Sequence, residues 1–290
     1  MRSSNPVFAN NAEFNGRATT QYADPSQWKI DLSGGNGGQG ERGAGLQAPT
    51  SPGRMTLDTV VEKTAITLGT VVLFAAVAWF AIGGMFNEQL GTVNESAVQK
   101  AWMFAMGGAI VGFVLAMVNS FKKIISPALV LAYAAAEGVF VGAFSKVVAT
   151  WVQDATIVFQ AVLATFIAAG ATLFAYKFFN IRVTDKFRRI VTISLFAFVG
   201  VMLVNFLLSI FGVLDQGGLR GFGFLGLVVS LVAIGLAVLC LILDFDSVER
   251  GVAAGLPERE SWRAAFGLTV TLVWLYLEIL RVLAILRGND

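Results

Sequence analysis

The chain has 290 residues, of which 56% are hydrophobic and 14% are charged, and its mean hydropathy of +0.71 exceeds that of water-soluble domains. The formal net charge of +2, carried by basic residues scattered among loops, excludes a nucleic-acid-binding surface. One cysteine and no histidine exclude an intrachain disulfide, histidine ligation of a metal and a Ser-His-Asp triad, so we expect neither an enzyme nor a cofactor.

The amino-terminal part of the chain is polar and rich in glycine. Residues 1–54 carry too few apolar side chains to fold alone, so we predict a disordered arm followed by one transmembrane domain over residues 55–290. No apolar stretch begins before Ala65, so we expect no secretory signal. The glycine cluster is not a phosphate-binding loop, because Gly40 is followed by Glu41 rather than by Lys-Ser or Lys-Thr.

Seven apolar stretches of about twenty residues follow, each long enough to cross a bilayer. The predicted helices lie near residues 65–84, 101–119, 124–148, 155–179, 189–214, 222–245 and 265–286. The longest connection, residues 246–264, is highly charged and is expected to lie in water or at the interface. The predicted fold class is therefore an all-α integral membrane protein, a bundle of seven transmembrane helices.

Lysine and arginine are concentrated at alternate ends of these helices. One side carries Arg54, Lys63, Lys122, Lys123, Lys177, Arg182, Lys186, Arg188, Arg189, Arg250, Arg259 and Arg263. The other side carries only Lys100, Lys146, Arg220, Arg281 and Arg287. The positive-inside rule then places the amino terminus and its arm in the cytoplasm and the carboxyl terminus outside, as an odd number of spans requires.

Two glutamates lie near the middle of predicted helices, Glu137 in the third and Glu278 in the seventh. An ionised side chain at the bilayer centre costs about 2.5–3.5 kcal/mol on insertion scales, so each must be paired, protonated or hydrated. An intramembrane acid is a functional candidate by default. The alternative is a protonated glutamate that only hydrogen-bonds a neighbouring helix.

Asp244 ends the apolar run of the sixth helix and precedes Glu278 by one helix. If these antiparallel helices pack together, the two carboxylates would couple and share a proton over some pH range. Without histidine, any response between about pH 5 and 8 must come from such carboxylates. Arg281, three residues after Glu278, is either its charge partner or extends outward to the interface. For Asp246, Glu249 and Glu258 we favour plain solvation.

Two further patterns bear on helix packing and on function. Gly108 with Gly112, and Gly138 with Gly142, have the small-xxx-small spacing that allows close helix crossings but also occurs by chance. The last span has no lysine, which excludes the Schiff base of a retinal protein.

Several segments resemble the transmembrane Bax inhibitor motif family, in its bacterial, YccA-like branch with a long arm. They are Leu243-Asp244-Phe245-Asp246, Trp274 to Leu283, Ala135-Ala136-Glu137-Gly138-Val139 and the opening residues 1–8. The resemblance covers residues 56–286. The chain departs from the family pattern at Glu278, where an aspartate is usual, and at Leu243, where a tyrosine is common.

The resemblance implies a bundle whose last helix is central, located in the plasma (inner) membrane of a bacterium. It also implies a pH-dependent calcium leak in which Glu137 lines the pore and Asp244 with Glu278 forms a pH-sensor pair. Calcium would be the permeant ion, and we assign no bound metal.

Two other functions stay open. The first is a non-conducting modulator that binds another membrane protein, since YccA-like relatives are linked to restraining a membrane protease. The second is proton-coupled transport, which ranks last because Pro127, near a helix start, is the only hint of a broken helix.

Overall fold

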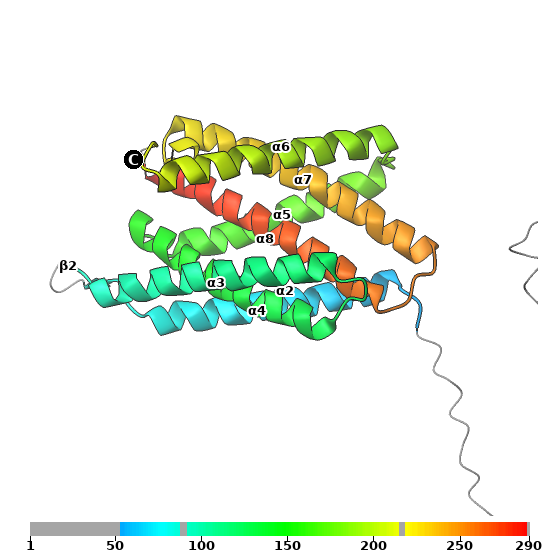
Figure 1. Cartoon of the computed structure of the whole chain (residues 1–290), viewed down its shortest axis with the longest axis horizontal. Coiled ribbons are helices and arrows are strands. Elements are labelled where there is room, and N and C mark those ends of the chain that lie inside the picture. Colours follow the sequence, from blue (N-terminus) through cyan, green and yellow to red (C-terminus); the bar gives the residue numbers. More distant parts are fainter. Residues whose placement is uncertain (1–52, 88–91, 215–217, 289–290) are drawn as a thin grey trace, which may run out of the picture. The chain divides into compact units, whose positions relative to one another are not determined.

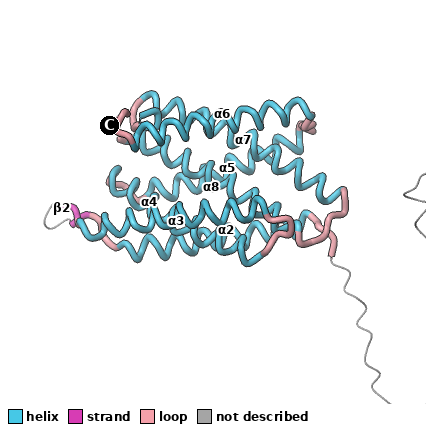
Figure 2. The backbone as a smooth tube through the Cα atoms, in the orientation of Figure 1, coloured by secondary structure: helices cyan, strands magenta, loops and turns pink. Residues whose placement is uncertain are grey.

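The computed structural model describes residues 53–87, 92–214 and 218–288. The predicted arm therefore lies outside the described residues, except for Gly53 and Arg54. Seven helices within the described part are long and apolar enough to cross a membrane, which confirms the predicted fold class (Figures 1 and 2).

The described chain is almost entirely helical. The spans are α2 (Leu57–Ile82), α3 (Glu95–Phe121), α4 (Pro127–Val152), α5 (Thr156–Phe178), α6 (Asp185–Ile210), α7 (Phe224–Ala253) and α8 (Glu260–Arg287). A hairpin of β1 (Phe86–Asn87) and β2 (Thr92–Val93) joins α2 to α3, and the short 3-10 helix η2 (Gly218–Arg220) precedes α7. Helices suit the interior of a lipid bilayer because they satisfy their own backbone hydrogen bonds.

Several helices begin one or two turns before the apolar stretch that predicted them, because polar residues cap their first turns. Thr56 forms a capping box with Thr59 at the start of α2, and Asn94 and Thr184 cap α3 and α6 through their side-chain oxygens. Pro127 occupies the first turn of α4, where no backbone N–H is needed. A hydropathy window does not detect these capping residues, because they are polar and lie outside the apolar stretch.

The last helix is the central one, as predicted. α8 packs against α2, α4, α5 and α7, and in Figure 1 it crosses between the group of α2, α3 and α4 and the group of α6 and α7. Within its apolar window 61% of the residues are buried, against 11% in α6. α8 is therefore the helix whose side chains meet other protein groups rather than lipid.

Both glycine pairs mark close helix crossings. A Cβ atom built on Gly138 would lie 2.5 Å from the carbonyl oxygen of Val71, and Gly142 similarly faces the backbone of Ala75, so these two glycines bring α2 against α4. A Cβ on Gly108 would lie 2.7 Å from the backbone nitrogen of Phe140, which brings α3 against α4. The small-xxx-small interpretation is thus confirmed for both pairs.

The connection between the last two helices is shorter than predicted. α7 continues past Asp244 to Ala253, so the loop comprises residues 254–259 rather than 246–264. It is held by the segment before α2, where the backbone N–H of Met55 donates to the carbonyl of Leu256 at 2.7 Å. Of the charged residues that suggested a long loop, Arg250 belongs to the last turns of α7, Glu260 and Arg263 belong to the first turn of α8, and Glu258 and Arg259 remain in the loop.

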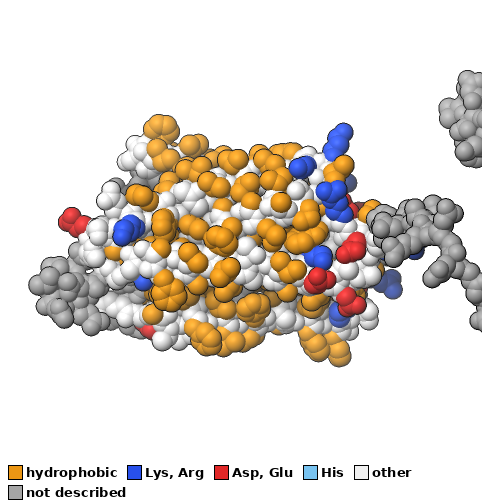
Figure 3. All heavy atoms as spheres, turned by 90° about the horizontal axis from the view of Figure 1, so that it is seen from below, with side chains coloured by type: hydrophobic (Ala, Val, Ile, Leu, Met, Phe, Trp, Pro, Cys, Tyr) orange, Lys and Arg blue, Asp and Glu red, His pale blue; other side chains and the backbone are white. Residues whose placement is uncertain are grey.

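Most charged side chains on the face shown in Figure 3 gather near one end of the helices, and hydrophobic side chains cover the middle. We call this the basic end. It is where α2, α4, α6 and α8 begin and where α3, α5 and α7 finish. An apolar band between polar ends is the pattern of a bilayer-spanning bundle.

Candidate functional site

Asp244 lies in the seam between α7 and α8. Its Oδ2 accepts a hydrogen bond from the Thr271 Oγ1 of α8 at 2.7 Å. The adjacent turn of α8 carries Gly267, where an added Cβ would lie 4.0 Å from Asp244 Oδ1, so no side chain separates the carboxylate from that helix. Asp244 has no basic partner within 4 Å among the described residues.

The neighbouring acids of α7 are paired with bases. Asp246 forms ion pairs with Arg188 of α6 at 2.8 Å and with Arg250 at 2.9 Å. Glu249 pairs with Lys177 of α5, and it also accepts from the hydroxyl of Tyr176. These contacts replace the plain solvation expected for both acids, and they leave Asp244 as the acid of this part of α7 that has only a neutral hydrogen-bond partner.

Glu278 lies further along α8, with 1% of its surface exposed. Its Oε1 accepts from Arg220 Nη2 at 2.8 Å, and its Oε2 has no partner among the described residues. Arg220 belongs to η2, which is held on α6 because the backbone N–H of Leu219 donates to the Asn205 side chain at 2.8 Å. A loop between α6 and α7 thus supplies the cation for an acid of α8.

Arg281 takes neither of the two positions left open for it, because it forms no ion pair with Glu278 within 4 Å and does not extend outward. Arg281 is 7% exposed, its guanidinium carbon lies 5.2 Å from the ring centroid of Phe222, and its Nε and Nη2 lack hydrogen-bond partners among the described residues. Arg220 takes the role that the sequence interpretation offered as one possibility for Arg281. Sequence spacing did not reveal this partner because it lies in a loop 58 positions away from Glu278.

The structure does not bring Asp244 and Glu278 together. Thr271, which binds Asp244, precedes Glu278 by seven residues, or about 10 Å of helix rise. Between the two levels lie Leu241 of α7 and Leu275 of α8, both fully buried in one apolar cluster. The two predicted sensor carboxylates therefore lie on opposite sides of an apolar layer.

Glu137 lies half-buried on α4 and faces α3. A Cβ built on Gly112 of α3 would lie 3.0 Å from Glu137 Oε2, so the absence of a side chain at this glycine makes room for the carboxylate. No hydrogen bond or ion pair of Glu137 is found within the described part of the chain. It is a second intramembrane acid without a cationic partner.

The level of Glu137 along the bundle follows from an aromatic contact. Tyr133 packs edge-on against Phe266, with ring centroids 5.0 Å apart. Because α4 and α8 both begin at the basic end, Glu137, one turn after Tyr133, lies near the level of the turn that includes Thr271. Glu137 and Asp244 thus lie at similar depths in the bundle, Glu137 between α3 and α4 and Asp244 between α7 and α8, with Glu278 further from the basic end.

Comparison with known families gives one finding. The sequence profile described as Bax inhibitor 1 like matches residues 5–288, which is nearly the whole chain. A comparison with individual curated proteins found no match.

Proposed function

The chain belongs to the Bax inhibitor 1 like family, and on that premise we propose that it is a pH-sensitive cation leak channel in the plasma membrane of a bacterium. The amino terminus would lie in the cytoplasm and the carboxyl terminus outside, with the basic end inward. The observation that carries the proposal is Asp244, an acid in a helix seam whose partner is a hydroxyl group rather than a cation.

The proposed gate combines this carboxylate with the apolar layer of Leu241 and Leu275. A neutral Asp244 leaves the layer packed and the path dry, and dry apolar constrictions block ions. An ionised Asp244 has no cation to offset its charge, so it draws water into the seam between α7 and α8. The leak should therefore increase as the pH rises through the titration of Asp244.

Calcium is the proposed permeant ion. It prefers six to eight oxygen ligands, which one carboxylate cannot supply. Asp244 and Thr271 would supply oxygens in the seam between α7 and α8, to be supplemented by water and backbone carbonyls, and Glu137 lies at a similar depth between α3 and α4. Glu278 would serve as a second acidic group beyond the apolar layer, reached once Arg220 moves away.

The test is calcium entry into liposomes that hold the purified protein, measured at several pH values. Asp244→Asn should flatten the pH dependence, and Glu137→Gln should lower the flux at every pH. Matched controls are Asp58→Asn and Glu95→Gln, which change exposed acids in the first turns of α2 and α3 and should leave the flux unchanged. Unaltered flux and pH response in both the Asp244→Asn and the Glu137→Gln variants would refute the assignment.

A second candidate function is a non-conducting modulator that binds another membrane protein, such as a protease. The observation that favours it is α6, whose apolar window is 11% buried, so most of this helix is free to meet a partner. We expect deletion of residues 1–52 to remove a co-purified partner while leaving ion flux intact if the arm serves binding. An absence of flux under all conditions would favour this function over the leak.

A further inference from the structure

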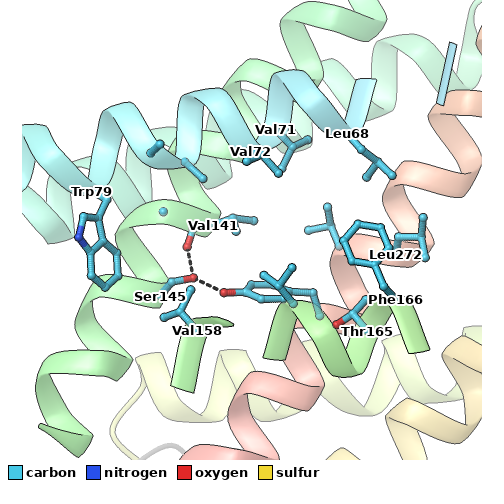
Figure 4. A pocket seen from close by; sticks show the side chains of 16 residues that line it. Leu68, Val71, Val72, Trp79, Val141, Ser145, Val158, Thr165, Phe166 and Leu272 are labelled. Carbon is cyan, nitrogen blue, oxygen red and sulfur yellow. Dashed lines mark hydrogen bonds between the residues drawn. The ribbon is translucent and has the colours of Figure 1, made fainter. Parts of the chain in front are cut away.

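A cavity of about 280 Å³ lies between α2, α4, α5 and α8, apart from the seam that holds Asp244 (Figure 4). Trp79 of α2 stands at one end of it, and Phe166 and Leu272 stand at the other. Most lining side chains are aliphatic or aromatic. A space of this size within a bundle is large enough to hold several heavy atoms of a ligand.

The polar atoms of the cavity wall are already paired. The Tyr276 hydroxyl donates to Ser145 Oγ at 2.7 Å, and Ser145 Oγ donates to the carbonyl of Val141 at 2.6 Å. Thr165 Oγ1 donates to the carbonyl of Ala161 within its own helix. The wall therefore offers an occupant an apolar surface, and water gains few hydrogen bonds there.

The cavity opens toward the hydrocarbon of the bilayer. Its two rims are Val72 of α2, which is 62% exposed, and Phe166 of α5, which is 58% exposed. Both residues lie well inside their spans, far from either helix end. An occupant that enters between these rims must come from the lipid phase.

The side-chain ammonium group of Lys146 lies at the Trp79 end of the cavity. Lys146 Nζ lies 4.5 Å from the centroid of the Trp79 ring and donates to the Trp79 carbonyl at 3.3 Å. No carboxylate lies within 4 Å of it among the described residues, whereas Arg220 and Arg287 at the same end pair with Glu278 and Asp154. Lys146 is thus a half-exposed cation free to meet an external anion.

An apolar slot that opens to lipid and ends at a cation and a tryptophan has the chemistry of a phospholipid site. We propose that the cavity binds an acyl chain of an anionic phospholipid whose headgroup phosphate contacts Lys146. The bound chain fills the space between α2 and α5. The site is independent of the proposed leak.

The test compares phosphatidylglycerol with phosphatidylcholine of identical chains, added to the protein in detergent. Phosphatidylglycerol should raise the melting temperature more, and native mass spectrometry should show more of it retained. Ala76→Phe, which fills the cavity from α2, should remove most of this shift. Lys146→Met should lower the preference for phosphatidylglycerol about fivefold, the effect of one lysine near an anionic surface.

The matched control is Ala65→Phe, an exposed position of α2 that does not line the cavity, and it should behave as the unaltered protein. A measurement that does not need the filled variant is quenching of tryptophan fluorescence by phosphatidylglycerol with brominated chains. The quenched fraction should fall in Trp79→Phe. Equal stabilisation by both lipids, or quenching that does not change in Trp79→Phe, would overturn the proposal.

Discussion

At the scale of single residues, the partner of each acid decides what that acid can do. Glu278 has a guanidinium within 2.8 Å, whereas Asp244 has a neutral hydroxyl at 2.7 Å. A paired acid holds its charge at little further cost, but an acid bound only to a hydroxyl group changes charge when water or protons reach it. The hydroxyl of Thr271 is therefore the group most directly able to tune a response of Asp244.

We expect Thr271→Val to move the pH of half-maximal leak upward by about one to two pH units, since a hydrogen bond to an ionised group contributes about 1.5–3 kcal/mol. The hydroxyl stabilises the ionised carboxylate, so its loss delays ionisation to higher pH. Calcium flux into liposomes between about pH 5 and 8 measures the shift. The control is Thr269→Val, a fully buried threonine of α8 whose Oγ1 has no hydrogen-bond partner among the described residues. Equal shifts in both variants would contradict the assignment.

At the scale of helices, the register of α7 on α8 is the feature that separates the two acids. In an antiparallel pair, moving from Asp244 back to Leu241 on α7 corresponds to moving from Thr271 forward to Leu275 on α8. The leucines are fully buried and form the layer that a conducting state would open under the proposed gating. On that proposal, the packing of one apolar layer would contribute to both stability and the closed state.

Leu275→Ala should lower the free energy of unfolding by about 2–5 kcal/mol and also raise the resting leak, because the cavity it leaves thins the layer between the two acids. Leu280→Ala is the matched comparison, since Leu280 is as deeply buried in α8 but lies in the cluster that includes Val273 and Ala284. Leu280→Ala should lower the free energy of unfolding by a similar amount without raising the leak. If both variants leak alike, general loosening rather than the layer is responsible.

Hydropathy predicted the seven spans, and residue spacing predicted both glycine crossings. The central position of the last helix was predictable from the family resemblance. The pairing of acids was not, because adjacency of two helices along the chain does not give their register. The contact of Arg220 with Glu278 depends on how a loop folds back, which no periodic pattern encodes. The assigned roles of Glu137, Asp244 and Glu278 stay predictions.

At the scale of the whole transmembrane domain, charge is distributed unevenly between the two ends. The basic end holds ion-pair networks around Asp246 and Glu249, and Arg263 donates to the backbone carbonyl of Lys123 at 2.9 Å. The opposite end carries fewer lysines and arginines. Since lysine and arginine remain preferentially on the cytoplasmic side, this asymmetry predicts one orientation for the whole bundle.

A membrane-impermeant maleimide should therefore label Ser96→Cys in intact cells and Lys123→Cys only after the membrane is opened. Both positions are exposed; Ser96 lies in the first turn of α3 and Lys123 lies two residues beyond its last residue, so the two ends of a single helix report both sides of the membrane. The native thiol of Cys240 is buried and gives the background from the unaltered protein. If Lys123→Cys alone were labelled in intact cells, the predicted orientation would be wrong. The Asp244 side of the apolar layer would then face the outside, and Lys146 beside the lipid-binding cavity would face the cytoplasm.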